Sequence, residues 1–472
     1  MKKCIVFIYL PGCITAVPAG VFTYDSALQQ GYFQYGRKYL ERENAQAVDP
    51  VALPLRRDLS GPIETNAGLF GAFRDSSPDH WGRMVIARKN KVSVSEFDEF
   101  DFLVNADASR VGNLDFRLSL DDPEPQYVPP TFQVISELVE AADRLQRSLP
   151  ISDEHQGMLN QGTSMGGARP KCTVKLEGDL WIAKLPAKDD AFNNARVEYA
   201  TMTLAARCGI QIPNISTMGL PDGRDVLLVK RFDRETRPDR WTRHGFLSAL
   251  SFMEWDEQAR ELFSYVSVSG RMRQMGLGLG SMKELYQRMA FNAFCRNTDD
   301  HPRNHGFLVE NGNLSLSPAY DIVPSAAKIG VGTEFSLAME IGARGRHGTL
   351  ENLLSKHGQF GLRPEEAKGL LFEMAKTVVD WKQHFHKSGV SDSEIDMFQG
   401  SFASPNLLGA MAAGDILPSP SSQGRTRPVL GFEDEGLLET GDVLADSEMM
   451  EQLKASAEDV KAGRLIDLED AF

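Results

Sequence analysis

Asn297-Thr298-Asp299-Asp300-His301-Pro302-Arg303-Asn304-His305 is the stretch on which the fold and chemistry of this chain depend. It follows residues 282–295, where Leu285, Met289 and Ala293 recur every four residues and predict an amphipathic helix. Beyond that helix, the stretch gathers side chains that accept protons, bind metal or orient phosphate. This cluster predicts a site for phosphate or metal chemistry at the end of the helix.

Asp299 and Asn304 have the D-x-x-x-x-N spacing of a protein-kinase catalytic loop. In that loop the aspartate receives the proton of the substrate hydroxyl, and the asparagine holds a magnesium ion. A second aspartate, Asp321, follows two strand-like segments, 307–309 and 314–316, that a turn joins. Two acids and an asparagine on a loop and a hairpin end predict a magnesium–phosphate site.

The spacing alone is weak evidence, because Asp and Asn after a helix often serve as caps and turn residues. A D-x-x-x-x-N match also arises by chance, so its weight depends on finding the other kinase parts upstream and in order. His301 and His305 have the same ordinary alternative, as loop residues without a chemical role.

The first upstream part is glycine-rich: Gln161-Gly162-Thr163-Ser164-Met165-Gly166-Gly167-Ala168-Arg169-Pro170-Lys171. It precedes a predicted hairpin of strands 172–176 and 180–185. Glycines such as Gly166 and Gly167 let backbone amides come close to phosphate oxygens. The spacing differs from G-x-x-x-x-G-K-[ST] and no helix follows, so the segment is not a P-loop. A phosphate-binding loop and a plain surface loop are both open interpretations at this point.

Lys184 lies in an otherwise apolar strand, and a lysine is costly to bury unless it is paired. Residues 195–208 then predict a helix with Glu198 near its start. A strand lysine and a glutamate on the following helix form the kinase arrangement that grips the α- and β-phosphates. The alternative is a chance pair on an edge strand.

Residues 226–229 form a further predicted strand, which leads into Lys230 and Phe232. The chain leaves the first lobe here, where an adenine-binding hinge is expected. Glycine-rich loop, strand lysine, helix glutamate, hinge, D-x-x-x-x-N and metal aspartate therefore occur in kinase order. Each part is weak alone, and together they are much stronger.

Composition fits an ordinary globular protein. The 472 residues predict two or three domains, with 42% hydrophobic and 25% charged residues. The five cysteines show no C-x-x-C spacing, which suits a reducing cytosol rather than a zinc site or disulfide framework. No segment is long and apolar enough to predict a membrane span. Residues 4–16 have the outline of a signal peptide, but Pro11 and Gly12 interrupt the apolar run, so a strand at 4–10 is favoured.

Charge and linker-like composition divide the chain into parts. Residues 1–125 predict a mixed α/β unit, in which Ser77 is a candidate cap for a helix that contains Trp81 and Val85. Residues 121–130 are a linker by composition, and 132–147 predict an amphipathic helix. The net charge is −14, of which 429–472 carry −10, so the body is nearly neutral and offers no basic stripe for nucleic acid.

Several motifs together resemble the HipA family of serine/threonine kinase toxins. They are Ser164-Met-Gly-Gly-Ala-Arg-Pro-Lys171, Trp181-Ile-Ala-Lys184, Val229-Lys-Arg-Phe-Asp233, Asn297-Thr-Asp-Asp-His-Pro-Arg-Asn304 and Ser317-Pro-Ala-Tyr-Asp321. Gly71-Ala-Phe-Arg-Asp-Ser-Ser-Pro-Asp-His-Trp-Gly-Arg83 resembles the family's smaller domain. The resemblance covers roughly 1–400, and the N-T-D-x-H-x-x-N string with the later Y-D is its most specific mark.

The resemblance implies an α+β fold, with a bilobal, lipid-kinase-related kinase domain at 150–400 behind a small α/β domain at 1–125. It also implies ATP and Mg²⁺ as cofactors, and Ser164 as an autophosphorylation site whose modification ejects the loop. In the implied site, Asp299 is the catalytic base, Lys184 grips the phosphates beside Glu198, and Asn304 and Asp321 bind the metal. The residues implied to line the nucleotide are Ser164, Gly166, Gly167, Lys230, Phe232, His301 and Tyr320.

The resemblance further implies a growth-arresting toxin in the cytoplasm. Its partners would be a small helix-turn-helix antitoxin similar to HipB, which alone contacts the DNA, and a protein substrate such as an aminoacyl-tRNA synthetase. Two features depart from the family pattern. Lys230 stands in the hinge where an acidic or neutral residue is expected, and 415–472 form a Pro/Ser linker and an acidic tail. A disordered tail is favoured over a RelB-like antitoxin helix at its end.

The leading hypothesis is therefore an ATP- and Mg²⁺-dependent serine/threonine protein kinase. A small-molecule phosphotransferase would use the same parts. A non-catalytic, antitoxin-binding corepressor would not need Lys184, Asp299, Asn304 and Asp321 together. A metal hydrolase built on Asp299, Asp300, His301 and His305 lacks an H-E-x-x-H pattern or further ligand set.

Overall fold

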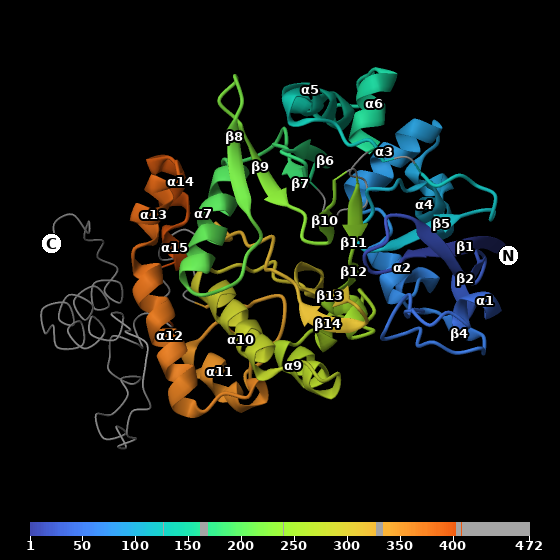
Figure 1. The fold of residues 1–472 in the computed structure, drawn as a ribbon. Coiled ribbons are helices and arrows are strands. Elements are labelled where there is room, and N and C mark those ends of the chain that lie inside the picture. Colours follow the sequence, from blue (N-terminus) through green and yellow to red (C-terminus); the bar gives the residue numbers. More distant parts are fainter. Residues whose placement is uncertain (126, 161–168, 239, 327–333, 403–406, 408–472) are drawn as a thin grey trace, which may run out of the picture.

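A computed structural model describes residues 1–125, 127–160, 169–238, 240–326, 334–402 and 407. Figure 1 shows a small N-terminal unit beside two further lobes, with a four-stranded sheet above and a helical lobe below. No helix among the described residues combines the length and apolar character that crossing a membrane requires. Ser164, Gly166, Gly167 and the tail at 415–472 lie outside the described residues.

The N-terminal unit is built on a five-stranded antiparallel sheet in the order β4-β3-β2-β1-β5. Its strands are β1 (Lys2–Tyr9), β2 (Ala16–Asp25), β3 (Gln30–Tyr35), β4 (Ser60–Ile63) and β5 (Leu114–Arg117). The first strand pairs on both sides, for example Cys4 with Phe22 and Ile5 with Arg117. The prediction of a strand at 4–10 is therefore confirmed.

Short helices complete this unit: α1 (Arg37–Leu40), η1 (Thr65–Gly68), α2 (Gly71–Asp75), α3 (His80–Asn90), η2 (Val94–Glu96) and α4 (Glu99–Asn105). The prediction that Ser77 caps α3 is wrong. Asp79 is the cap, since its carboxylate accepts a hydrogen bond from the Gly82 amide at 2.7 Å. The helix begins at His80, which places Ser77 too far upstream to reach its first turn.

The upper lobe contains the predicted hairpin and helix. Its sheet has the order β6-β7-β9-β8, with β6 (Lys171–Leu176), β7 (Asp179–Lys184), β8 (Ile215–Gly219) and β9 (Asp225–Lys230). One face packs on α7 (Asn194–Arg207), through Ile182 and Leu227. The other face packs on α5 (Ile135–Gln146) and α6 (Asp153–Asn160), which η3 (Phe132–Val134) precedes. Alternation along the strands thus gives this sheet two buried faces.

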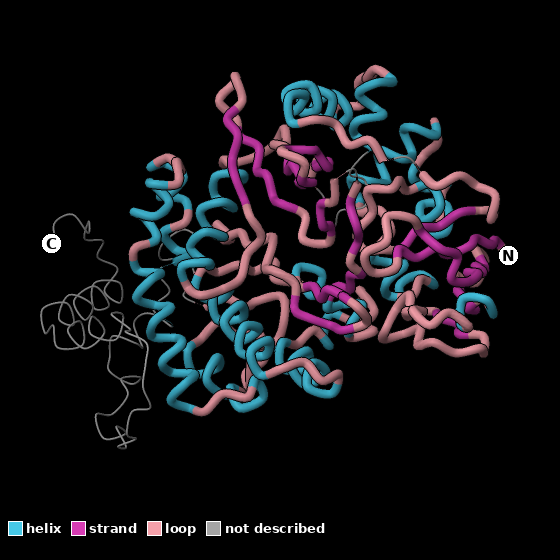
Figure 2. Tube along the Cα trace, viewed as in Figure 1, coloured by secondary structure: helices cyan, strands magenta, loops and turns pink. Residues whose placement is uncertain are grey.

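The lower lobe is mostly helical, as Figure 2 shows. A three-stranded sheet, β12 (Gly245–Ser248), β13 (Gly306–Glu310) and β14 (Asn313–Leu316), includes the predicted hairpin. The predicted helix before 297–305 is α10 (Leu279–Phe294), whose buried residues lie in the largest hydrophobic core. The remaining elements are β10 (Arg234–Thr236), β11 (Trp241–Arg243), α8 (Ala249–Phe252), η4 (Arg260–Leu262), α9 (Tyr265–Gln274), η5 (Pro302–Asn304), α11 (Leu350–Ser355), η6 (His357–Phe360), α12 (Pro364–Val379), α13 (Trp381–Lys387), α14 (Asp392–Met397) and α15 (Gln399–Phe402).

Candidate active site

Lys184, Glu198 and Asp321 meet although the chain separates them widely. The Lys184 ammonium lies 2.5 Å from Glu198 Oε1 and 2.6 Å from Asp321 Oδ1. Lys184 ends β7, Glu198 lies in α7, and Asp321 follows β14. The lysine therefore joins the upper lobe to the residue that the sequence predicts as a metal ligand.

Electrostatics favour a charged lysine in this cluster. Burial alone would lower the pKa of Lys184, but the carboxylates of Asp321 and Glu198 raise it above its usual value. Burial likewise opposes ionisation of Asp321, yet the ammonium of Lys184 holds its pKa below the usual value. Burial raises the pKa of Glu198, because only 7% of its side chain is exposed. Asp321 thus keeps a full negative charge at neutral pH.

Asp321 has an unusual backbone, with φ of 61°. Few residues other than glycine adopt this left-handed region, and Asp and Asn are the most tolerant of them. The turn after β14 aims the carboxylate back toward Lys184. A left-handed backbone conformation at a residue other than glycine is found more often at functional sites.

The 297–304 loop is held by its own backbone and side chains. Asn304 Nδ2 donates to the Asp299 carbonyl at 2.9 Å, as does the His301 amide at 2.8 Å. The Asp299 amide donates to Asn297 Oδ1 at 3.3 Å. The Asp299 side chain itself is exposed. The predicted base is therefore fixed through its main chain while its carboxylate faces solvent.

The two predicted metal ligands present the oxygens that Mg²⁺ prefers. Asn304 uses its amide nitrogen to fix the loop, and its amide oxygen accepts no hydrogen bond from any described residue. Asp321 uses Oδ1 for Lys184, which leaves Oδ2. The described residues contain no group of three His, Cys, Asp or Glu that could hold a metal alone. One carboxylate, one amide and substrate phosphates fit magnesium, which seldom uses an all-protein cage.

Asp300, beside the exposed Asp299, is fully buried and accepts hydrogen bonds from interior groups. Tyr265 OH donates to Asp300 Oδ2 at 2.8 Å, and the Ala338 amide donates to Oδ1 at 2.6 Å. The same hydroxyl lies 2.9 Å from His305 Nε2 and accepts from Asn292 Nδ2 at 2.9 Å. These contacts anchor the 297–304 loop to α9, α10 and the segment around Ala338. Tyr265 and Asn292 carry no recognisable signal in the sequence, because their partners are distant along the chain.

Burial sets the ionisation of this network. It raises the pKa of Asp300 to about 8, with a further contribution from the charge of Asp299. It lowers the pKa of His305 to about 3, helped by Arg288 and His301. His305 is therefore neutral, and Asp300 is partly protonated near neutral pH. Both are structural groups rather than the metal ligands of the hydrolase hypothesis.

We expect Asp300→Asn to flatten the dependence of stability on pH between about 6.5 and 8. An unfolded aspartate titrates near 4, so the folded protein retains a proton that the unfolded chain has released. Stability is therefore lost as pH rises toward the folded pKa of about 8. In this window the loss amounts to at most ~2 kcal/mol. Thermal denaturation of both proteins at the two pH values measures it.

Asp392→Asn is a matched control, since the Asp392 side chain is 89% exposed and its nearest ionic partner, His386 Nε2, is 3.9 Å away. It should keep the pH dependence of the unmodified protein. His305 titrates in the unfolded chain near pH 6.5, but it does so in both proteins, so its contribution cancels in the comparison. Parallel curves for Asp300→Asn and the unmodified protein would contradict the assignment of a proton to Asp300.

The aromatic residues predicted to line a nucleotide lie together. The rings of Phe232 and Tyr320 have centroids 5.8 Å apart at an interplanar angle of 32°. Tyr320 OH donates to the Arg303 carbonyl at 2.8 Å, which connects Asp321 to the 297–304 loop. Phe232 is half-buried. The two rings thus offer an apolar surface between the hinge and the acidic residues.

Lys230 takes a different direction. Its ammonium lies 2.5 Å from Asp179 Oδ2, at the turn of the β6–β7 hairpin. Lys230 pairs with Trp181 across the sheet, whereas Lys184 pairs with Leu227. Because side chains alternate along a strand, Lys230 and Lys184 leave opposite faces of the sheet. The structure does not bring the hinge lysine together with the other predicted site residues.

Lys171, at the end of the glycine-rich segment, forms a contact that the sequence did not reveal. Its ammonium lies 2.7 Å from Asp79 Oδ2, and both side chains are almost fully buried. Trp81 Nε1 donates to the Lys171 carbonyl at 3.2 Å. Lys171 pairs across the sheet with Lys184. The N-terminal unit therefore reaches the strand that begins immediately after the predicted phosphate loop.

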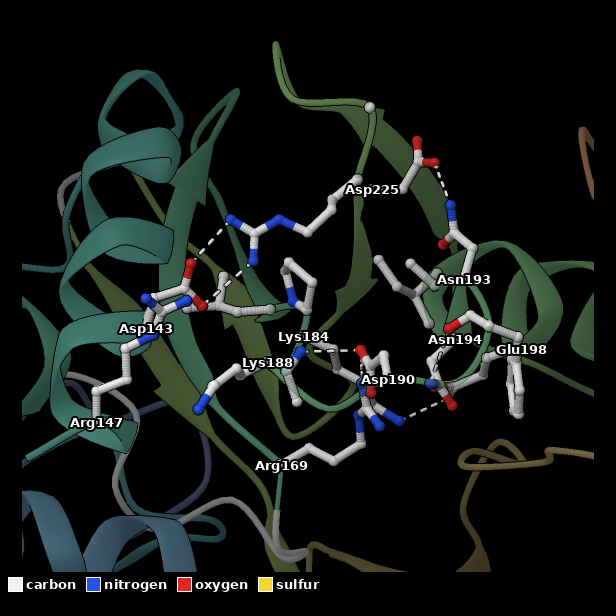
Figure 3. A pocket seen from close by; sticks show the side chains of 18 residues that line it. Asp143, Arg147, Arg169, Lys184, Lys188, Asp190, Asn193, Asn194, Glu198 and Asp225 are labelled. Carbon is white, nitrogen blue, oxygen red and sulfur yellow. Dashed lines mark hydrogen bonds and ion pairs between the residues drawn. The ribbon is translucent and has the colours of Figure 1, made fainter.

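A pocket of about 370 Å³ adjoins Lys184 and Glu198. Figure 3 shows Arg147 and Lys188 on one side of it, Asn193, Asn194 and Glu198 on the other, and Arg169 beside Asp190 between them. Arg169 Nη2 lies 2.5 Å from Asp190 Oδ2, and Arg224 pairs with Asp143 at 2.9 Å. Several of its cations are thus compensated by acids within the pocket wall.

The fold and the Lys184–Glu198–Asp321 cluster define a kinase-like, two-lobed α+β protein with an additional N-terminal domain. Residues 163–382 match the family model for the HipA-like C-terminal domain, and 13–117 match that for the HipA N-terminal domain. The chain belongs to the HipA family, which confirms the resemblance seen in its motifs.

A solved structure agrees with this assignment of the fold. The chain is similar to one in the Shewanella oneidensis MR-1 toxin–antitoxin complex of HipA, HipB and operator DNA, with 16% identity and a TM-score of 0.57. That alignment covers 98% of this chain and 100% of the other. A match to the Helicobacter pylori proinflammatory kinase CtkA has 13% identity and a TM-score of 0.37, over 50% of this chain and 87% of that one. A comparison with curated protein sequences found no significant match.

Proposed function

We propose that this chain is an ATP- and Mg²⁺-dependent serine/threonine protein kinase that acts as the toxin of a toxin–antitoxin pair. The observation that carries the proposal is the Lys184 ammonium between Glu198 and Asp321, at 2.5 and 2.6 Å. Kinases use this arrangement to hold nucleotide phosphates against a metal-binding aspartate. A corepressor would gain nothing from burying an ion cluster of this kind, because buried charges are costly to desolvate.

The residues would divide the work by position. Lys184 would bind the α- and β-phosphates, with Glu198 fixing its direction. Asp299, exposed on a rigid loop, would orient the acceptor hydroxyl and take its proton. Phe232 and Tyr320 would cover the base. Catalysis by such a site rests on positioning and charge stabilisation rather than on a covalent intermediate.

Asn304 and Asp321 would hold magnesium, as the free oxygens on both side chains allow. The ion would neutralise negative charge on the transferred phosphoryl group. The glycine-rich segment that contains Ser164, Gly166 and Gly167 would close over the phosphates. We include Ser164 as an autophosphorylation site, because a phosphate there would add about −1.5 to −2 charges where ATP phosphates lie.

The partner would be a small, HipB-like helix-turn-helix antitoxin that binds operator DNA. The support is the likeness to a HipA chain solved with HipB and its operator. The nearly neutral body agrees with DNA contact through a partner rather than directly. The protein substrate would be a component of translation, such as an aminoacyl-tRNA synthetase.

The test is transfer of phosphate from ATP to serine or threonine by the purified chain, with Asp321→Asn as the diagnostic variant. Asparagine tolerates the left-handed backbone at 321, so the fold should be retained. Loss of the carboxylate should weaken Mg²⁺-dependent nucleotide binding by about 10-fold or more. Titration of a fluorescent ATP analogue, with and without Mg²⁺, measures the change.

Asp392→Asn serves again as the exposed, matched control and should bind nucleotide as the unmodified protein does. Phosphate transfer only to a small metabolite would replace the protein kinase with a small-molecule phosphotransferase. Growth arrest without any transfer would favour the corepressor. Retention of Mg²⁺-dependent binding by Asp321→Asn would remove Asp321 from the metal site.

A further inference from the structure

A second pocket, of about 290 Å³, opens beside the 297–304 loop, and we call it the acceptor-side pocket. Its wall includes Asp299, together with the side chains His301, Glu257, Arg260, Arg303 and Arg346. It therefore adjoins the residue that would orient the acceptor hydroxyl, and it shares no lining residue with the pocket beside Lys184 and Glu198. A ligand in this pocket would therefore lie next to the acceptor hydroxyl that Asp299 would orient.

Glu257 is already neutralised within this wall. Its Oε2 pairs with Arg74, from α2 of the N-terminal unit, and its Oε1 lies 3.3 Å from Arg303. Burial opposes the charge of Glu257, but these two arginines keep its pKa below the usual value. Both carboxylate oxygens are thus engaged. Glu257 cannot also compensate the other two arginines of the pocket at full strength.

Arg260 and Arg346 make no ion pair with any residue in the described part of the chain. Arg346 Nη2 donates to the Arg260 carbonyl, which orients its guanidinium without removing its charge. His301 contributes a third unfilled position, because its buried Nδ1 has no hydrogen-bond partner among described residues. Buried polar atoms normally have partners, so this nitrogen retains an unused hydrogen-bonding capacity beside the pocket.

The wall is tied to the 297–304 loop. The Leu337 amide donates to the Arg346 carbonyl at 3.0 Å, and the adjacent Ala338 amide donates to Asp300 at 2.6 Å. Arg260 begins η4, and its carbonyl accepts from the Phe263 amide at 3.2 Å, while the Phe263 carbonyl accepts from the Glu340 amide at 2.8 Å. These bonds fix the backbone at both arginines relative to the 297–304 loop. A ligand bound by them would therefore be held in register with the reacting hydroxyl.

We propose that the acceptor-side pocket binds a carboxylate side chain, so that the preferred substrate is an acidic peptide segment with Asp or Glu beside its acceptor serine or threonine. The proposal rests on the proposed kinase function, which makes Asp299 the acceptor-orienting group. Arginine forks match carboxylates in two-point contact. Asp299 and both arginines line the same pocket of about 290 Å³, and an extended chain advances about 3.3–3.6 Å per residue, so the acidic residue would lie close to the acceptor along the peptide.

A nucleic acid is a poorer candidate for this pocket. Non-specific strand binding needs a charged groove that follows several phosphates, with aromatic platforms for bases. Here the uncompensated positive charge is confined to two arginines in a pocket that accommodates one or two side chains. The body outside the tail carries only a small net charge. A single anionic side chain is the ligand whose size and charge fit.

The experiment uses the full-length protein and two fluorescent peptides with a central serine. One peptide carries Glu on both sides of the serine, and the other carries Gln at the same positions. Fluorescence anisotropy measures binding, and labelled ATP measures transfer to the serine. The Glu peptide should bind about 10-fold or more tightly than the Gln peptide, because it gains charge-assisted hydrogen bonds. The double variant Arg260→Gln/Arg346→Gln should reduce that preference to near equality.

Arg37→Gln/Arg344→Gln is the matched control, since it removes the same charge from exposed arginines, one of them two residues from Arg346. It should preserve the preference for the Glu peptide. Equal binding of both peptides, or binding of neither, overturns the acidic-substrate inference. Clear preference without any transfer supports the pocket and counts against the kinase function instead. A preference that survives Arg260→Gln/Arg346→Gln also overturns the assignment.

Discussion

Asp299→Asn should lower the rate of phosphoryl transfer at least ~100-fold while leaving the fold intact. The Asp299 carboxylate is exposed, and the loop is held through its backbone amide and carbonyl. Removing the charge therefore costs the loop none of its anchoring hydrogen bonds. Asparagine is nearly isosteric but cannot accept a proton from the substrate hydroxyl. Initial rates of transfer to a serine peptide, at saturating ATP, measure the loss.

The adjacent residue supplies a contrast within the same motif. Asp300→Asn alters a buried carboxyl that bonds Tyr265 and the Ala338 amide, so its main effect should be on stability. Nucleotide binding by Asp299→Asn should match the unmodified protein, because the Lys184 cluster is unchanged. Unaltered transfer by Asp299→Asn would remove this residue from the catalytic centre. Loss of folding in Asp299→Asn would instead show that the Asp299 carboxylate makes a contact on which the loop depends, contrary to its exposed position.

The sequence predicted those parts of the site whose chemistry is local in the chain. Lys184 stood out as a charge in an apolar strand, and Asp299 and Asn304 as a fixed spacing after a helix. Their elements are confirmed as β7, α10 and η5. Local signals were sufficient here because hydrophobic periodicity and short motifs determine where an element ends. The same holds for the β13–β14 hairpin that carries Asp321.

Contacts between distant segments could not be predicted. Tyr265 meets Asp300 across 35 positions, and Lys171 meets Asp79 across 92. Neither pair has a fixed spacing, since packing of whole lobes brings them together. The mistaken cap at Ser77 has a related cause. Ser77 and Asp79 are both good capping residues, and Asp79 has the additional attraction of the buried Lys171 ammonium.

Lys230 shows how a motif can mislead about direction. Its place in the hinge is as expected, at the end of β9. The alternation of side chains along the sheet nevertheless sends it away from Lys184, to Asp179. A sequence match fixes a residue's position along a strand, and the pairing register then fixes its face. Under the proposed function, adenine would therefore contact Phe232 and the hinge backbone rather than the Lys230 ammonium.

Lys184→Met should abolish nucleotide-dependent transfer, with a loss of at least ~100-fold, and should also destabilise the fold. The substitution leaves the carboxyl groups of Glu198 and Asp321 without their shared cation. Breaking a buried pair by removing one partner typically costs ~3–5 kcal/mol. The orphaned carboxylates should then hold protons that the unfolded chain releases above about pH 4. The variant's deficit in melting temperature should consequently grow as pH rises from about 5 to about 8.

Lys175→Met is the matched control, because Lys175 is an exposed lysine on the neighbouring strand β6. It should retain transfer and keep a pH dependence parallel to that of the unmodified protein. In cells, expression of the unmodified chain alone should slow growth, and Lys184→Met should relieve the effect when its soluble level is matched. Equal growth inhibition by both proteins would indicate that toxicity does not require phosphate binding. A stability deficit that stays constant with pH would mean that Glu198 and Asp321 find another cation, and that Lys184 is not the group that keeps them charged.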